Sequence, residues 1–192
     1  MTSVSGMISL IHCNEDVGGF PKDESGLLWT DGSNMSVVTS SPKFGSGCLF
    51  NIAGSGRIKK VVGEEFNFLA DDFTIEKWFK MDYVDTVTLF NIGSESNSAG
   101  CYGYHCFMTL TYSACNVTFQ VIDDGVDIVY DYTDVGASPA YANTWAHICF
   151  VKSGTNGYFF LNGVKKITYS GLPETLPDIN LNDVSQRYVS LG

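Results

Sequence analysis

The sequence predicts an all-β protein, an antiparallel β-sandwich made of two sheets. Three observations lead to this fold class. The apolar residues occur in short runs separated by Gly, Asn, Asp and Ser, as is typical of many short strands joined by turns. Two pairs of these runs flank hairpin turn sequences, and no segment carries a long helical period. Antiparallel pairing of short strands is therefore expected throughout.

The hairpins are the strongest local signals. Asn162-Gly163 separates the strand-forming runs 158–161 and 164–167, and both turn residues tolerate the positive φ of a type I′ turn. A second hairpin is expected across 119–130, with its turn at Asp123-Asp124-Gly125. These two hairpins predict four antiparallel strands.

The remaining strands follow from apolar runs bounded by turn residues. In residues 145–151 both alternating sets are largely apolar, which predicts a central strand covered on both faces. The stretches 33–41 and 93–100 are expected to be surface loops. Further strands are predicted at 7–12, 47–51, 57–62, 73–81, 87–92, 106–112 and 145–152.

Length and charge limit the domain organisation and the partners. The 192 residues fit a single sandwich domain spanning 1–192, large enough to form a core without metal or disulfide. The net charge of -10 argues against nucleic acid and against anionic membranes as partners. Residues 1–10 lack the features of a secretory signal. Either the chain is not exported by that route, or it comes from a longer polypeptide.

Six cysteines occur at irregular spacing without a CxxC pair, which argues against a zinc site. Cys48 and Cys149 lie in strand-like runs and are expected to be small buried hydrophobic residues. Cys101 and Cys106 are close enough in sequence for a local disulfide, and the sequence leaves their redox state open.

Eight short segments follow one another in an order that matches a known family. They are Ser9-Leu10-Ile11-His12, Asp23-Glu24-Ser25-Gly26, Pro42-Lys43-Phe44-Gly45-Ser46-Gly47, Asp72-Phe73-Thr74-Ile75-Glu76, Trp78-Phe79-Lys80, Leu89-Phe90, Trp145 to Lys152 and Gly157 to Gly163. Together they span about 160 residues and resemble the laminin-G-like jelly rolls of the concanavalin-A-like lectin and glucanase superfamily. The resemblance implies a jelly-roll sandwich, in the form found in structural proteins of phages and other virions.

The chain departs from the family pattern in two places. Lys77 replaces an apolar residue on the inward face of its strand, so it is expected to be paired or to extend outward at a sheet edge. The family's usual final strand follows a segment like Tyr188 to Gly192, and this chain stops there. The open strand edge that results predicts a longer parent polypeptide or a strand supplied by a partner.

The carboxylate pattern argues against an enzyme. Retaining glycosidases of this superfamily need two carboxyl groups about 5 to 5.5 Å apart, and their Glu-x-Asp-x-x-Glu sequence is absent. Glu76 is alone on its strand, while Asp123-Asp124 fits a turn. Gly54-Ser55-Gly56 also fits a turn better than a nucleophile elbow. The expected activity is therefore non-enzymatic.

The candidate ligand-binding residues are Tyr102, Tyr104 and His105, in the aromatic segment Tyr102-Gly103-Tyr104-His105. Exposed tyrosine rings stack on sugars and also fill protein interfaces. The alternative is that these rings cover one end of the core. His12 and His147 lie on predicted strands and are expected to be structural.

No cofactor is expected beyond a calcium ion suggested by the resemblance. Many relatives bind calcium through an acidic residue in an early loop, and Asp23 is the only position that matches. Calcium takes six to eight oxygen ligands, so a single carboxylate would need carbonyl oxygens to complete the site.

We expect a recognition or assembly module, and the resemblance implies a phage tail, fibre or capsid-associated protein assembled in the host cytoplasm. Its partners would be other structural subunits or the parent polypeptide, together with a glycan ligand. The first alternative is an extracellular carbohydrate-binding or adhesion module. The second is a glycoside hydrolase-like enzyme with an unrecognised site. Fold alone separates none of these.

Overall fold

The computed structural model describes part of the chain, and every regular element in that part is a strand apart from a single 3₁₀ position at Phe66. No helix among the described residues has the length and apolarity needed to cross a bilayer. The described residues are 11–17, 20–33, 35–40, 42–51, 57–61, 66, 68, 70–80, 86–93, 102–110, 114–136, 143–175 and 188–191.

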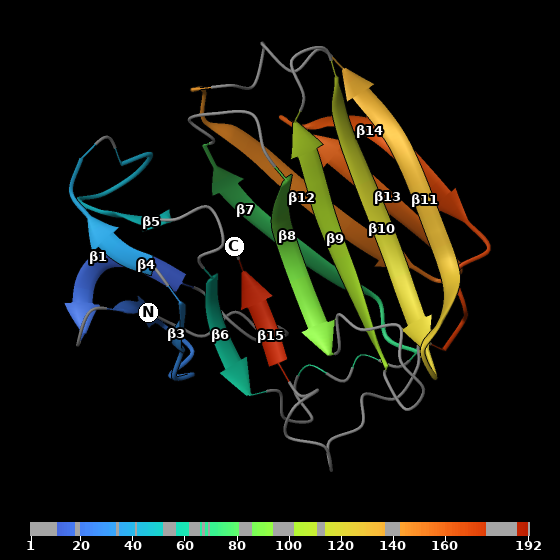
Figure 1. The fold of residues 1–192 in the computed structure, drawn as a ribbon, viewed down its shortest axis with the longest axis horizontal. Coiled ribbons are helices and arrows are strands. Elements are labelled where there is room, and N and C mark those ends of the chain that lie inside the picture. The colour runs from blue at the N-terminus through green and yellow to red at the C-terminus, as the bar shows by residue number, and fades with distance from the viewer. Residues whose placement is uncertain are drawn as a thin grey trace.

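The described strands form two main sheets and two small ribbons. The larger sheet has the order β11-β10-β9-β8-β15-β6-β3 and the smaller one the order β14-β13-β12-β7, while β1 pairs with β2 and β4 with β5. Every pairing is antiparallel (Figure 1). The strands are β1 (Ile11–Val17), β2 (Phe20–Asp23), β3 (Thr30–Ser33), β4 (Met35–Val38), β5 (Cys48–Asn51), β6 (Arg57–Val61), β7 (Phe73–Phe79), β8 (Thr86–Gly93), β9 (Gly103–Leu110), β10 (Cys115–Asp123), β11 (Val126–Gly136), β12 (Ala146–Ser153), β13 (Asn156–Leu161), β14 (Val164–Ser170) and β15 (Tyr188–Leu191).

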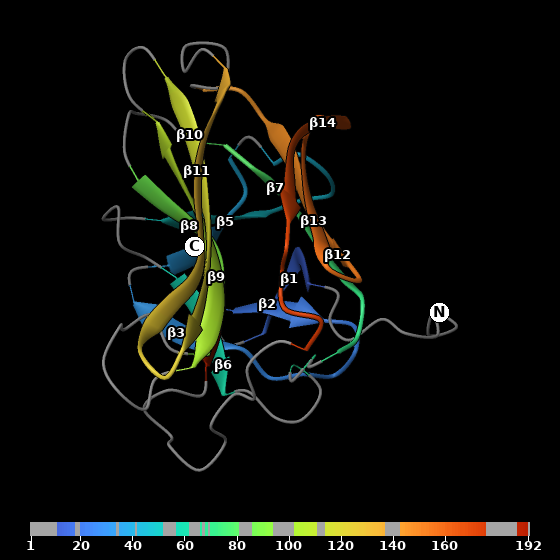
Figure 2. The ribbon, with the colours of Figure 1, turned by 90° about the vertical axis from the view of Figure 1, so that its right-hand side faces the viewer.

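The two main sheets lie face to face, and Figure 2 shows them edge-on as two layers. Aromatic side chains fill the space between them. Phe150 of β12 stacks on Phe119 of β10 with ring centroids 4.4 Å apart, and it also contacts Phe90 of β8 and Tyr169 of β14. All four rings are buried. The predicted two-sheet sandwich is therefore confirmed.

Both predicted hairpins are present. Asn162 and Gly163 have φ values of 51° and 77°, and Asp124 and Gly125 have 49° and 74°. Positive φ at both central residues is what a type I′ turn requires. The Asn162 side chain also connects this turn to β12, because its Oδ1 accepts a hydrogen bond from the His147 backbone N–H at 2.8 Å.

Strand β12 differs from its prediction on one face. Its inward set, Ala146, Ile148 and Phe150, is buried, whereas the outward set of His147, Cys149 and Val151 is only half-buried. Among the described residues this outer face is not fully covered, although alternation of apolar residues on both faces predicted that it would be.

Two segments fold differently from the prediction. The stretch 33–41, expected to be a loop, contains strand β4, which pairs with β5 through Val37 and Leu49. Residues 188–191, expected to precede the last strand, form strand β15 between β6 and β8. Strand β15 pairs with β8 through only two residue pairs, Val189 with Ile92 and Ser190 with Asn91. The predicted strand at 7–12 lies outside the described residues except for Ile11 and His12.

Two lysines lie on or beside the edge strand β7. Lys77 shares the inward face of β7 opposite Ile148 and is half-buried, and its pairing or outward extension stays a prediction. Lys152 of β12 is 1% exposed, and its Nζ lies 3.4 Å from the Asp71 carbonyl oxygen. The next residue, Asp72, accepts hydrogen bonds from Ser153 Oγ and the Gly154 N–H. These contacts bind the start of β7 to the turn between β12 and β13.

Candidate functional site

The face of the seven-stranded sheet that points away from the core carries polar side chains. Phe119 faces the core, so its neighbours Thr118 and Gln120 on β10 point the other way. Gln120 pairs with His105 of β9, and His105 pairs with Asn91 of β8. The register therefore aligns an amide, an imidazole and a second amide across three adjacent strands. We call Asn91, His105, Thr118 and Gln120 the polar cluster.

Three residues of the polar cluster are buried although they lie outside the sandwich core, and His105 is half-buried. Asn91, Thr118 and Gln120 are 2%, 1% and 7% exposed. Asn91 donates a hydrogen bond from Nδ2 to the Gly93 carbonyl oxygen at 3.0 Å, which fixes the orientation of its amide. Its Oδ1 and the Oγ1 of Thr118 are buried and have no hydrogen-bond partner among the described residues. A buried acceptor left without a donor costs about 1–3 kcal/mol, so a donor that reached either oxygen would add stability.

Glycine shapes the end of this face. Gly93 closes β8 with a φ of 89°, and a Cβ at this position would collide with the Tyr102 carbonyl oxygen and with Gly103. The close approach brings β8 and β9 together directly beside Asn91. Only glycine meets both requirements, the left-handed backbone and the lack of a side chain.

The three predicted ligand-binding residues are separated by strand alternation. His105 points outward and belongs to the polar cluster. Tyr104 points into the core, where it is fully buried, and its hydroxyl donates to the Phe66 carbonyl oxygen at 3.0 Å. Burial raises the pKa of the Tyr104 hydroxyl well above its usual range. The prediction that Tyr104 contacts a ligand is corrected, because adjacent strand residues face opposite sides of a sheet.

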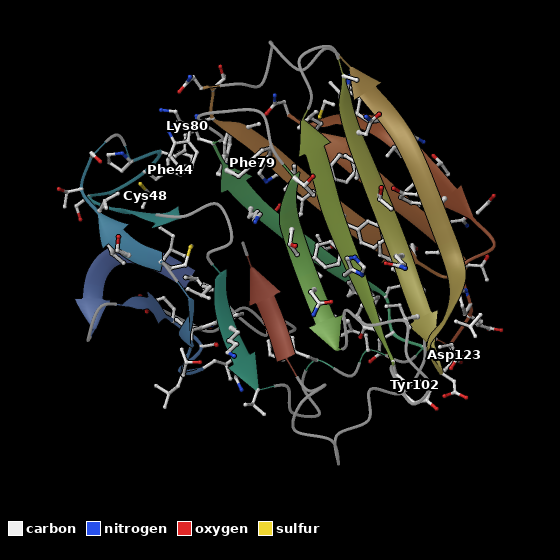
Figure 3. The ribbon with its side chains drawn as sticks, viewed as in Figure 1. Phe44, Cys48, Phe79, Lys80, Tyr102 and Asp123 are labelled. Atoms are coloured by element: carbon white, nitrogen blue, oxygen red, sulfur yellow. The ribbon has the colours of Figure 1, made fainter. Side chains whose placement is uncertain are left out.

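Tyr102 is half-buried just before β9, at the end of an interior strand of the seven-stranded sheet. Gly103 pairs with Ile122, so Tyr102 lies near Asp123 and the turn between β10 and β11, as Figure 3 shows. The cover of the core end that was predicted for these tyrosines comes from Tyr104, which contacts Phe68 and Phe73.

Asp23, the predicted calcium ligand, is 6% exposed and surrounded by donors. Its Oδ1 accepts hydrogen bonds from the Ser25 N–H and Oγ, and its Oδ2 accepts one from Trp29 Nε1 at 2.7 Å. Both oxygens thus organise the turn after β2 and hold the buried Trp29. Among the described residues, no group of three or more His, Cys, Asp or Glu side chains could hold a metal ion.

The histidine and cysteine predictions have mixed outcomes. His147 lies on β12 with its Nε2 3.4 Å from Glu76 Oε2, and the side chain of His12 is outside the described residues. Cys115 is buried, while Cys48 and Cys149 are half-buried, and all three are free thiols. Cys101 lies outside the described residues, so the predicted Cys101–Cys106 disulfide stays a prediction.

Burial raises the thiol pKa of both half-buried cysteines, and nearby charges modulate the shift in opposite directions. Lys80 partly offsets the effect of burial at Cys48, whereas Glu76 adds to it at Cys149. Figure 3 shows Cys48 and Lys80 where the β4–β5 ribbon approaches the end of β7.

No local sequence signal pointed to Asn91, Thr118 and Gln120 as site residues. Each is an ordinary polar residue in an alternating strand, and only the register of three strands brings them together. The alternation of β10 could have indicated that Thr118 and Gln120 share a face.

The architecture defines a class of protein, the two-layered antiparallel jelly rolls. Within this class, the chain belongs to the family Laminin_G_3, described as concanavalin A-like lectin/glucanases superfamily, which matches residues 55–185. This range is more than half of the chain, and it includes all four residues of the polar cluster.

Two solved structures with the same fold have low sequence identity to this chain. Domain 4 of AbnA, a GH43 extracellular arabinanase from Geobacillus stearothermophilus in complex with arabinotriose, is 15% identical with a TM-score of 0.51, covering 88% of this chain and 76% of that one. The β-glucanase of Bacillus licheniformis is 13% identical with a TM-score of 0.52, covering 95% and 83%. A search of curated proteins found no match.

Proposed function

We propose that this domain binds a glycan without cleaving it, through the polar cluster on the outward face of the seven-stranded sheet. One observation carries the proposal: Asn91 Oδ1 and Thr118 Oγ1 lack a donor among the described residues, and the half-buried His105, paired with Asn91, links them to the surface. A sugar presents several hydroxyl groups that can donate to such acceptors. The amide of Gln120 and the imidazole of His105 border the same positions.

The comparisons support a sugar ligand and an extracellular location. The arabinanase domain that shares this fold is described as part of an extracellular enzyme and is bound to arabinotriose. At 15% identity this resemblance concerns the fold, so the choice of ligand for this chain is our proposal.

The absence of catalysis is part of the proposal. The polar cluster consists of two amides, an imidazole and a hydroxyl, and it contains no carboxyl group. Hydrolysis by a retaining mechanism needs two carboxyl groups about 5 to 5.5 Å apart. Release of shorter oligosaccharides from a bound glycan would contradict this part.

Binding is tested by isothermal titration calorimetry with arabinotriose and a panel of neutral oligosaccharides. We expect His105→Ala and Gln120→Ala each to weaken binding about tenfold, the loss of one or two hydrogen bonds. Thr168→Ala, on the exposed face of β14, is the matched control and should bind like the parent protein. If no glycan binds at millimolar concentration, or if both variants bind normally, the proposal fails.

Assembly into a virion is a second proposal, favoured by a different observation. The outward face of β12 and β13 carries Cys149, Val151, Tyr158 and Phe160, which are all half-buried. Such an apolar sheet face suits contact with another structural subunit. Electron microscopy of particles labelled through a tag on this chain would test it, and unlabelled particles would count against it.

A further inference from the structure

Two exposed aromatic rings meet on the opposite layer of the molecule. Among the described residues, Phe44 and Trp78 are the aromatic side chains classed as exposed, at 64% and 40%. Their ring centroids lie 5.6 Å apart at an interplanar angle of 83°. The two rings form a right-angled corner with a large accessible apolar surface.

The corner is built from segments that are distant in sequence. Trp78 points outward from β7 and is paired with His147 of β12, whose ring centroid lies 5.1 Å away. Phe44 lies in the turn before β5, where Gly45 has a φ of 63°. This turn sets Phe44 against the outer side of the edge strand β7 (Figure 3).

A cation is held in the same corner. Lys43 Nζ lies 4.2 Å from the centroid of the Trp78 ring and 5.6 Å from that of Phe44. We call Lys43, Phe44 and Trp78 the aromatic corner. Figure 3 shows Lys80 in the same region as Phe44, and Glu76, on the same strand as Trp78, lies 3.4 Å from His147.

We propose that the aromatic corner is a second glycan site, selective for a sugar unit that carries a carboxylate, such as a uronic acid. The apolar face of a pyranose ring packs on an exposed aromatic ring. A carboxylate on the same sugar accepts a charge-assisted hydrogen bond from the Lys43 ammonium. A neutral sugar would gain only the first contact and a small anion only the second. The two-point match therefore selects an acidic sugar.

This second site is independent of the polar cluster, because the two lie on opposite outer faces of the sandwich (Figure 2). The domain would then hold two different parts of one mixed polysaccharide, or two separate chains. Two linked contacts raise the overall affinity beyond that of either contact alone.

The test is a calorimetric titration of the full chain with tri-galacturonic acid, and with its methyl ester as the uncharged probe. We expect Lys43→Met to weaken binding of the acid about fivefold, as for an exposed ion pair, and to leave the weak binding of the ester unchanged. Phe44→Ala should weaken binding of both about tenfold. Lys166→Met on β14, an exposed lysine elsewhere on the surface, is the matched control.

Three results would overturn the proposal. The acid and its methyl ester bind equally well, or Phe44→Ala and Lys43→Met bind the acid normally, or the acid does not bind at all. Loss of acid binding in Gln120→Ala but not in Phe44→Ala would assign it to the polar cluster instead. If neutral glycans still bind at the polar cluster, a failure of the acidic-sugar site leaves the proposed function intact. Lys43 is half-buried and Phe44 is exposed, so thermal unfolding should confirm that both variants fold.

Discussion

The two outer faces of the sandwich contrast in a way that the core between them does not explain. The outward face of the seven-stranded sheet buries polar groups, with Thr118 only 1% exposed and its hydroxyl without a partner. The outer side of the four-stranded sheet does the reverse, leaving 40% of Trp78 accessible. Both features lower the stability of the fold, because a buried polar group without a partner loses its hydrogen bonds to water and an exposed aromatic ring keeps apolar surface in water.

The contrast is the basis of the two proposed binding sites, one at the polar cluster and one at the aromatic corner. The core has neither feature, since its own rings pack closely between the sheets. We therefore expect substitutions between the layers to change mainly stability, and substitutions on the outer sides to change mainly binding.

The largest expected effect comes from removing a ring between the layers. Phe150 is 2% exposed and stacks on Phe119 at 4.4 Å. Phe150→Ala should lower the free energy of unfolding by about 3–5 kcal/mol, as measured by urea denaturation. Phe44→Ala, which removes the same ring from the surface, should cost less than about 1 kcal/mol. If the two variants lost similar amounts of unfolding free energy, Phe44 would contribute to stability as much as a core ring does.

The next effect separates stability from recognition on the polar face. Thr118→Val replaces the unpaired hydroxyl by a methyl group of similar shape, so it should raise the free energy of unfolding by about 1–2 kcal/mol. The same change should weaken glycan binding. Thr168→Val, an exposed threonine, should change neither quantity. A Thr118→Val variant that is less stable would mean that the hydroxyl has a structural role.

The smallest effect concerns the charges near the two half-buried thiols. Glu76→Gln removes a charge that raises the pKa of Cys149, so alkylation of Cys149 at pH 8.5 should accelerate about twofold, because the thiolate reacts. Lys80→Gln removes a charge that lowers the pKa of Cys48, and alkylation there should slow by a similar factor. Peptide mass spectrometry measures both rates. Unchanged rates would show that these charges are screened.

The raised pKa values of Cys48 and Cys149 make the stability of the fold depend on pH. Because folding raises the pKa of both thiols, the folded state holds these protons more tightly than the unfolded state. The contribution of the two thiols to the free energy of unfolding is fully present below the unfolded pKa of about 8.5 and is lost as pH rises through the folded pKa.

Much of the fold could be predicted from local patterns. The turn residues Asn162 and Gly163 demand positive φ, and the structure gives 51° and 77°. Alternation in β7 likewise predicted that Lys77 shares the inward face of its strand, whereas the apolar residues on both faces of β12 did not reveal which face meets the core. Strand β15 could not be predicted, because four residues carry too little pattern and their place between β6 and β8 depends on long-range pairing.

The candidate sites were only partly predictable. His105 belongs to the polar cluster, but its neighbour Tyr104 faces the core. The alternation of strand residues could have separated these two from the start. Phe44 and Trp78 appeared only as parts of two separate family-like segments, and nothing in either segment indicated that their rings meet.

Local patterns predicted most of the strands and both hairpin turns, because these depend on neighbouring residues and on a period of two. Which polar and aromatic side chains meet on the outer faces depends on the complete fold. Strand register and the position of the turn before β5 set those encounters, and both depend on contacts between residues far apart in the chain.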